Sequence, residues 1–222
     1  IVSIAKENGL SLADQVAREL REDIIGGRLL SGMPLVESEL VRAYNASRNT
    51  VREALHLLGR EGLTTYVRHK GVIVRRLTVD DVRDLFMVRR TLESQAILTG
   101  KLLIDSSSAR MADAIEAAEL ASEREDWRAF GTHSLRFHQQ VVGLLHSPSF
   151  DEFFTNIVAQ MRLVFSAAPD EARYQAPWLA RDRHIHQLLI EGHRREAGEA
   201  MDSYLNDSEH QALDLLSCAA RH

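Results

Sequence analysis

Apolar residues recur every three or four positions along most of the chain, which is the spacing of amphipathic helices. The first such stripe consists of Leu12, Val16, Leu20 and Ile24. Ser11 precedes it and is a good N-cap, while Gly26-Gly27 follows it and is a favourable helix end. The sequence therefore predicts a first helix that begins after Ser11 and ends at the glycine pair.

A second stripe predicts a helix that begins after Ser47, again with a serine as N-cap. Its apolar positions are Val51, Ala54, Leu55 and Leu58. A short helix over residues 37–44 is expected just before it, because Asn45-Ala46 has the character of a turn. Two helices joined by a tight turn are therefore expected in this part of the chain.

Two short β-branched runs follow, and they are typical of the strands of a hairpin. They span residues 64–67 and 72–75 and flank His69-Lys70-Gly71. We expect a first domain, residues 1–76, to end with this hairpin.

The rest of the chain has helical patterning throughout. Thr78 and Asp81 have the spacing of a capping box at the start of a long helix. Its apolar face consists of Val82, Leu85, Phe86, Leu92, Ala96 and Ile97. Further helix boundaries are expected near residues 105–108, 125–126, 146–149, 169–177 and 192–193. The fold class is therefore mainly α, with a small hairpin-bearing domain and a helical bundle over residues 77–222.

Charge is divided unevenly between these two parts. The net charge of the 222 residues is −5, yet residues 1–76 hold 12 Lys/Arg against 9 Asp/Glu. A polyanion is therefore expected to meet only the first part. The lone cysteine, Cys218, excludes an intramolecular disulfide and fits a reducing cytoplasm. No apolar run approaches the ~18 residues of a membrane span, and no signal peptide is expected.

The helix after Ser47 carries candidate DNA-reading chemistry in its first turn. Arg48 and Arg52 can bond the O6/N7 edge of guanine, Asn49 can bond the N6/N7 edge of adenine, and Ser47 or Thr50 can bond a phosphate. A helix that enters the major groove places its first residues at the base edges. A solvated helix start without function would show the same residues, so the surrounding motifs decide.

Those motifs occur in a fixed order and spacing. They are Leu20 through Leu29, Gly32-Met33-Pro34-Leu35, Glu37-Ser38-Glu39-Leu40, Leu57 through Leu63, and Lys70 through Val74. Over about residues 10–76 this run resembles the winged helix-turn-helix of the GntR family of bacterial transcription regulators. The resemblance implies DNA contacts by Ser47, Arg48, Asn49, Thr50, Arg52, His69, Lys70 and Gly71. Ser38 departs from the family, in which this position is often basic and touches DNA.

The second part, from about residue 78 to residue 217, resembles the FCD ligand-binding domain that accompanies such winged helices. The carrying residues are Arg89-Arg90-Thr91-Leu92-Glu93, Phe137-His138, and Gly192 through Met201. Many FCD domains bind a metal through one Asp and three His. Here these positions fall on Ser134, His138, Asp182 and Tyr204, so only the first histidine matches.

Three interpretations of this face remain open. In the first, Ser134, His138, Asp182, His186 and Tyr204 bind an organic effector directly, and Arg89 binds its carboxylate. In the second, His138, Asp182 and His186 form a remodelled site for Zn²⁺ or Ni²⁺. In the third, these are polar core residues that satisfy one another.

We expect the protein to be a transcription regulator of the repressor type. Its affinity for the operator is expected to be controlled by an organic acid. One winged helix reads only a few base pairs, so a homodimer on a palindromic double-stranded DNA operator is expected. The alternatives are a helical-bundle metalloenzyme and an architectural DNA-binding protein. The sequence contains no H-E-x-x-H motif, which argues against the metalloenzyme. The second part has ~140 residues, more than dimerisation alone needs, which argues against the architectural protein.

Overall fold

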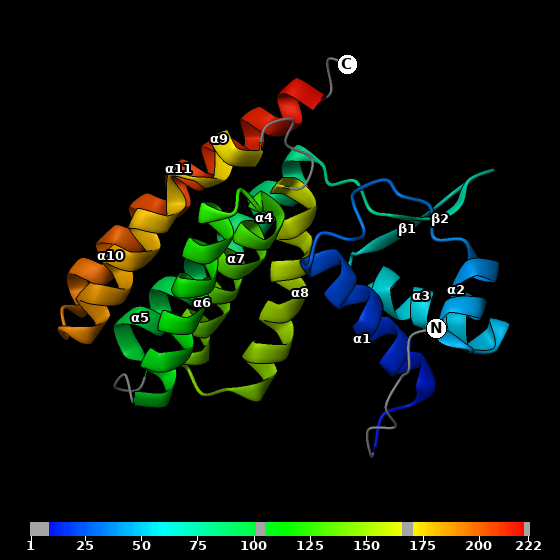
Figure 1. The fold of residues 1–222 in the computed structure, drawn as a ribbon, viewed down its shortest axis with the longest axis horizontal. Helices are drawn as coiled ribbons and strands as arrows, with labels where there is room; N and C mark the ends of the chain where they lie inside the picture. The colour runs from blue at the N-terminus through cyan, green and yellow to red at the C-terminus, as the bar shows by residue number, and fades with distance from the viewer. Residues whose placement is uncertain (1–8, 101–104, 166–170, 220–222) are drawn as a thin grey trace. The chain divides into compact units, whose positions relative to one another are not determined.

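The computed structural model describes residues 9–100, 105–165 and 171–219. The chain divides into two compact units, residues 1–76 (unit 1) and residues 77–222 (unit 2). Each unit is described by itself, with its elements labelled in Figure 1. Within the described residues, no helix combines the length and apolar character that crossing a membrane requires.

Unit 1 contains a three-helix arrangement followed by a hairpin. Its elements are α1 (Leu12–Ile25), α2 (Glu37–Tyr44), α3 (Arg48–Arg60), β1 (Thr64–Val67) and β2 (Gly71–Val74). Ser11 caps α1 in a capping box with Asp14, as its position before the apolar stripe predicted. Asn45 adopts the left-handed conformation (φ 49°) and turns the chain from α2 into α3.

The core of unit 1 lies where α1 packs against α3. Val16 and Leu20 of α1 and Val51 and Leu58 of α3 are buried, as their spacing predicted. Leu12 is 43% exposed, although the pattern placed it in the apolar stripe, whereas the neighbouring Ala13 is buried. The buried face of α1 therefore begins at Ala13 and not at Leu12.

The hairpin is antiparallel, and Val67 pairs with Gly71. The second strand thus begins one residue earlier than predicted, because Gly71 adopts φ 76° and can close the tight turn. A bridge between Pro34 and Ile73, which the sequence did not reveal, ties the preceding loop to β2.

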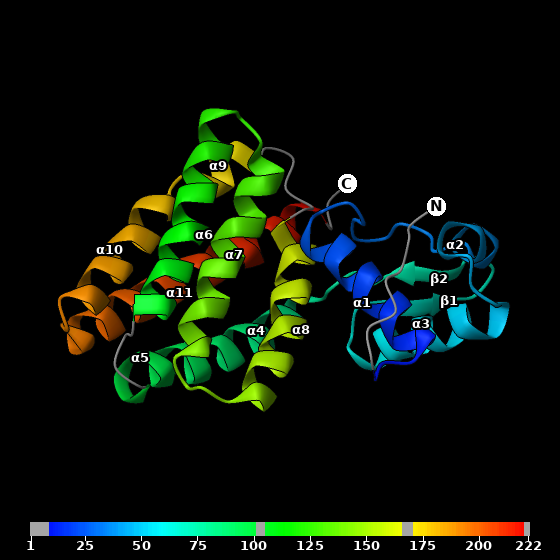
Figure 2. The same ribbon diagram turned by 60° about the horizontal axis from the view of Figure 1, so that its bottom comes forward.

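Unit 2 is built from helices throughout its described part. They are α4 (Val79–Arg89), α5 (Gln95–Thr99), α6 (Asp105–Glu123), α7 (Trp127–Gly143), α8 (Pro148–Phe165), α9 (Glu171–Gln175), α10 (Trp178–Ile190) and α11 (Arg194–Ala219). The breaks near residues 125–126, 146–149 and 192–193 fall close to the predicted boundaries, and α6 begins at Asp105 as expected. Helix α9 lies within the link predicted over residues 169–177, of which residues 169 and 170 are outside the described residues. Figure 2 shows α7 between α6 and α8, and α7 also contacts α10. Its buried side chains include four phenylalanines: Phe86, Phe130, Phe137 and Phe154.

One local feature of unit 2 differs from the predicted long helix. Between α4 and α5, residues Arg90–Ser94 form a π-helical turn. Thr78 does cap α4 in a capping box with Asp81, as predicted. The π turn leaves Arg89 and Glu93 almost wholly buried, with 2% and 0% of their surfaces exposed. Such turns are frequent at functional sites.

Candidate functional site

The first turn of α3 presents polar side chains on the surface of unit 1. Ser47 caps this helix, since its Oγ accepts a hydrogen bond from the backbone N–H of Thr50 at 3.1 Å. The hydroxyls of the same two residues lie 2.8 Å apart. Arg48 and Asn49 are exposed and extend from this turn. The cap therefore fixes the helix start while the next two side chains face solvent.

Arg52 lies one turn further along α3 and is held by a residue that sequence reasoning missed. Its Nε donates to both carboxylate oxygens of Glu37, at 3.1 and 2.9 Å. Glu37 is the first residue of α2, so the contact joins the two helices of the predicted turn. The contact runs through Nε, and the Arg52 side chain remains 60% exposed.

Lys70 and Gly71, near the tip of the hairpin, line a groove together with residues of α3. His69 adopts φ 67° at the tip of the hairpin, and His69 and Lys70 are both exposed. The groove has a volume of about 570 Å³ and lies between α3, the hairpin and the loop before α2. Tyr66 (74% exposed) and His56 also line it. No recurring spacing in the sequence distinguishes these two residues.

In unit 2, buried charges form a hydrogen-bonded chain across the bundle. Arg89 Nε donates to Glu93 Oε1 at 2.7 Å, and Glu93 Oε2 lies 2.5 Å from His138 Nδ1. All three side chains are at most 2% exposed. Burial alone would raise the pKa of Glu93, but the neighbouring Arg89 and His138 hold this pKa below its ordinary value. The Glu93 carboxylate therefore links the Arg89 guanidinium to the His138 imidazole.

Asp182 of α10 lies beside this hydrogen-bonded network, but His138 makes no hydrogen bond to it. His138 Nε2 lies 3.6 Å from Asp182 Oδ1, and neither atom has a hydrogen-bond partner among the described residues. Ser134 Oγ donates to Asp182 Oδ2 at 2.9 Å. Burial raises the pKa of Asp182 to about 6, against the lowering influence of His138 and Ser134. Asp182 is therefore close to half-protonated near pH 6.

Tyr204 of α11 completes this cluster. Its ring centroid lies 4.7 Å from that of His138, and the residue is 4% exposed. Burial, with help from Asp182, raises the pKa of Tyr204 well above its ordinary value. Tyr204 therefore remains a neutral hydroxyl that can both donate and accept.

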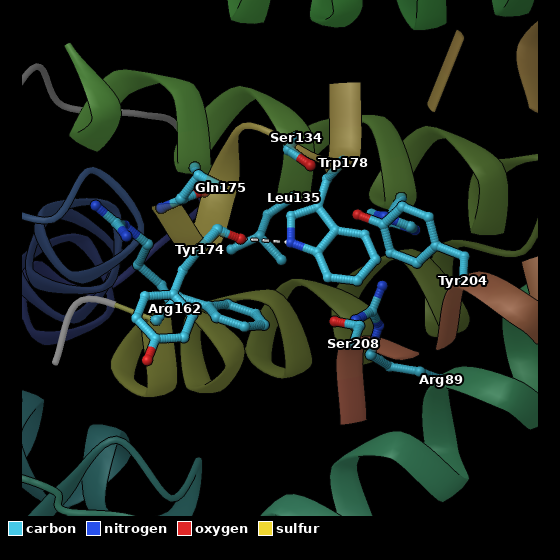
Figure 3. Close-up of a pocket in the computed structure, with 12 residues that line it drawn as sticks. Arg89, Ser134, Leu135, Arg162, Tyr174, Gln175, Trp178, Tyr204 and Ser208 are labelled. Carbon is cyan, nitrogen blue, oxygen red and sulfur yellow. Dashed lines mark hydrogen bonds between the residues drawn. The ribbon is translucent and has the colours of Figure 1, made fainter. Parts of the chain in front are cut away.

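These side chains border a small cavity of about 20 Å³, enough for roughly one water molecule. Figure 3 shows Trp178 in its middle, with Gln175 on one side and Arg89, Ser208 and Tyr204 on the other. The cavity is also lined by residues that the sequence did not point to: Gly131, Leu135, Arg162, Tyr174, Gln175, Trp178 and Ser208. Arg162 is wholly buried here, and its Nη2 donates to the backbone oxygen of Arg128.

The structure brings together five of the six candidate residues of unit 2. Arg89, Ser134, His138 and Tyr204 line the cavity, and Asp182 lies directly behind Ser134 and His138.

His186 is the exception. Its Nε2 lies 3.3 Å from Ser108 Oγ of α6, and His186 is not among the residues that line the cavity. Among residues 9–100, 105–165 and 171–219, no group of three His, Cys, Asp or Glu side chains could hold a metal ion. The expected Zn²⁺ or Ni²⁺ set of His138, Asp182 and His186 is therefore not assembled. The residues present do not fit such a metal.

Comparison with known proteins gives the same division of the chain. Residues 12–74 match the family described as bacterial regulatory proteins, gntR family, and residues 84–207 match the FCD domain. The chain is 36% identical over 164 residues to the HTH-type transcriptional regulator BphR of Paraburkholderia xenovorans. This match covers 69% of the chain and 66% of BphR, so it leaves about a third of that relative unmatched.

Two further similarities extend over nearly the whole chain. The galactonate operon transcriptional repressor of Escherichia coli is 24% identical, over 96% of each chain. A crystal structure described as a transcriptional regulator GntR from Rhodococcus sp. RHA1 is 33% identical, with a TM-score of 0.83. The similarity covers 92% of this chain and 99% of that one. With a winged helix-turn-helix in unit 1 and an FCD domain in unit 2, this chain belongs to the GntR family of transcriptional regulators.

Proposed function

We propose that this protein is an operon repressor whose operator affinity is controlled by an organic acid bound in the cavity of unit 2. The observation that carries the effector assignment is the guanidinium of Arg89. It is 2% exposed and lines the cavity, and its Nη2 has no hydrogen-bond partner in the described part of the chain. A buried cationic donor is suited to bind a carboxylate.

The surroundings of Arg89 support direct binding without a metal. Glu93 occupies its Nε, which leaves the outer edge of the guanidinium for a ligand. Ser134, His138 and Tyr204 add polar groups on the same cavity, while Trp178 and Leu135 add apolar surface. Pockets that combine an apolar wall with a few converging polar groups are typical of small-molecule sites. The galactonate operon repressor, named after an acid, is a relative that supports this class of effector.

On the DNA side, we assign base reading to Arg48, Asn49 and Arg52, and phosphate binding to Ser47 and Thr50. The exposure of Arg48 and Asn49 in the first turn of α3 supports this assignment. His69, Lys70 and Gly71 at the hairpin tip are assigned to the adjacent DNA backbone or minor groove. Arg52 and Lys70 both line the groove between α3 and the hairpin, which supports a role for both in binding DNA.

We further propose a homodimer on a palindromic operator. A two-fold symmetric dimer presents two recognition helices to two half-sites, and each helix alone reads only a few base pairs. Light scattering at micromolar concentration should give twice the 25.0 kDa of one chain. A monomer at that concentration would remove this part of the proposal.

A gel-shift titration tests the regulatory proposal. The DNA is the region beside the protein's own gene, and the acids are galactonate, gluconate, succinate, adipate, benzoate and 4-hydroxybenzoate. We expect at least one acid to weaken operator binding by a coupling of ~1–3 kcal/mol, about 5- to 150-fold. Arg89→Ala or His138→Ala should abolish the response and leave DNA affinity without acid nearly unchanged. Loss of DNA binding with the acid response retained would show that the effector binds elsewhere.

A further inference from the structure

The side chain of Gln175 forms one side of the unit 2 cavity and belongs to none of the interactions described above. It is the last residue of α9 and is 5% exposed. Its Nε2 has no hydrogen-bond partner among the residues that the structure describes. A buried amide donor without a partner is unfavourable, so such a group in a folded protein calls for an explanation.

Helix α7 makes room for this amide at a single position. A Cβ atom at Gly131 would lie 2.7 Å from Gln175 Oε1 and closer still to Nε2. Any residue other than glycine would therefore push the amide away from α7. Because α9 packs against α7 at this point, the Gln175 amide is held directly against the helix backbone.

A second donor without a partner faces the same cavity from the opposite side. This donor is Arg89 Nη2, which lies beyond Trp178 as seen from Gln175 (Figure 3). The indole of Trp178 lies between the two, and Leu135 adds apolar surface. The indole nitrogen is already engaged, since it donates to the Tyr174 backbone oxygen at 2.6 Å. Within the described residues, the cavity therefore has a donor without a partner on each side of the Trp178 indole.

We propose that Gln175 is a second recognition point that selects effectors with an oxygen acceptor at the end opposite the carboxylate. Arg89 binds the carboxylate, Trp178 and Leu135 contact the carbon skeleton, and Gln175 Nε2 donates to the distal oxygen. The effector class is then a dicarboxylic acid or an acid with a distal hydroxyl or carbonyl group, and simple monocarboxylic acids are discriminated against. This inference rests on the proposed function, which places the carboxylate at Arg89.

Isothermal titration of the full chain with matched pairs of acids tests this selection. The pairs are butyrate and succinate, hexanoate and adipate, and benzoate and 4-hydroxybenzoate. In at least one pair, the wild-type protein should bind the second acid about tenfold or more tightly, because a site built around a donor rejects a ligand that lacks the acceptor. Gln175→Met keeps the length of the side chain but removes the donor. The ratio of the two affinities in that pair should therefore fall close to one.

Two further variants separate this role from a structural one. Gln187 is exposed on α10 and away from the cavity, so Gln187→Met should keep the wild-type preference. Gly131→Ala leaves Gln175 in the chain but displaces its amide, so it should lose the preference as Gln175→Met does. Circular dichroism spectra should confirm that all variants fold.

The outcomes distinguish this inference from the proposed function. If an acid binds in an Arg89-dependent way but Gln175→Met keeps the wild-type preference, Gln175 has no selective role and the proposed function stands. If no acid binds at millimolar concentration, or Arg89→Ala binds as well as the wild type, the carboxylate assignment fails and this inference fails with it.

Discussion

At the scale of single residues, Glu93 is the centre of the polar interior of unit 2. Its two carboxylate oxygens serve two different partners, the Nε of Arg89 and the Nδ1 of His138. All three groups are excluded from water, so each depends on the others for compensation of its lost hydration. Removal of the carboxylate charge would leave a buried guanidinium without its counter-ion.

Glu93→Gln should therefore destabilise unit 2 by ~3–5 kcal/mol, the effect expected when a buried ion pair loses one partner. Denaturant unfolding measures this free energy. Glu199→Gln is the matched control, because Glu199 is 70% exposed and pairs with Arg195 on the surface of α11. That change should alter the free energy of unfolding by less than about 1 kcal/mol. Similar effects of the two substitutions would mean that the interior network contributes little.

The contribution of Asp182 to the free energy of unfolding should fall as the pH rises. A carboxylate whose pKa is lowered by folding would show the opposite dependence. Burial raises the folded-state pKa of Asp182 from 3.8 to about 6, so the folded state binds the proton more tightly than the unfolded state. Stability that depends on Asp182 is therefore greatest below about pH 4 and falls as the pH rises through 6. Asp182→Asn removes this titration and keeps an oxygen that can accept from Ser134.

The stability of Asp182→Asn relative to wild type should thus increase between pH 5 and pH 7.5. Urea unfolding at several pH values in that window measures the difference. The low pKa of Glu93 acts in the other direction, since its contribution is lost only when the pH falls below its ordinary range, outside this window. A difference between the two proteins that does not change with pH would contradict the assignment of a raised pKa to Asp182.

At the scale of elements, the sequence predicted correctly those helix starts that depend on interactions between neighbouring residues. Capping boxes at Ser11 and Thr78 and the cap at Ser47 fixed three helix starts correctly. The bridge between Pro34 and Ile73 and the π turn at Arg90–Ser94 were missed, because both depend on packing against distant segments. Such contacts leave no periodic trace in the sequence.

The same distinction explains which residues of the cavity the sequence could point to. Arg89 and His138 belong to motifs with fixed spacing, and the structure places both on the cavity. Gln175 and Trp178 reach it only because α9 and α10 fold back onto α7, which no spacing reveals. His186 was placed on the face of Asp182 by helical spacing, yet α6 offers Ser108 as a nearer partner.

Helix α3 supplies the prediction that belongs to this scale. Arg48 lies in its first turn and Arg60 is its last residue, and both are exposed. Arg48→Ala should weaken operator binding by ~1–3 kcal/mol and relax specificity at one base pair, whereas Arg60→Ala should have a much smaller effect. Fluorescence anisotropy with operator and single-base variants measures both. Equal losses from the two substitutions would show that α3 acts through charge alone.

At the scale of the whole molecule, the DNA-reading and effector-binding assignments fall on different units. Only residues 75–78 separate the end of β2 from the start of α4. Arg89 is the last residue of α4, so a ligand on its guanidinium acts on the helix that continues from the hairpin. An effector changes DNA affinity only if it binds two arrangements of the molecule unequally. On the proposed function, we expect α4 to be the element that transmits this preference.

The small volume of the cavity also has a kinetic consequence. A space for about one water molecule admits no acid of four or more carbons unless Trp178 or the segment carrying Gln175 first moves. Association is then preceded by an opening step, and stopped-flow tryptophan fluorescence should show it. The observed rate constant should level off at high acid concentration, at the rate of opening, whereas a preformed pocket would give a straight line. Gly131→Ala, which displaces Gln175, should raise that plateau.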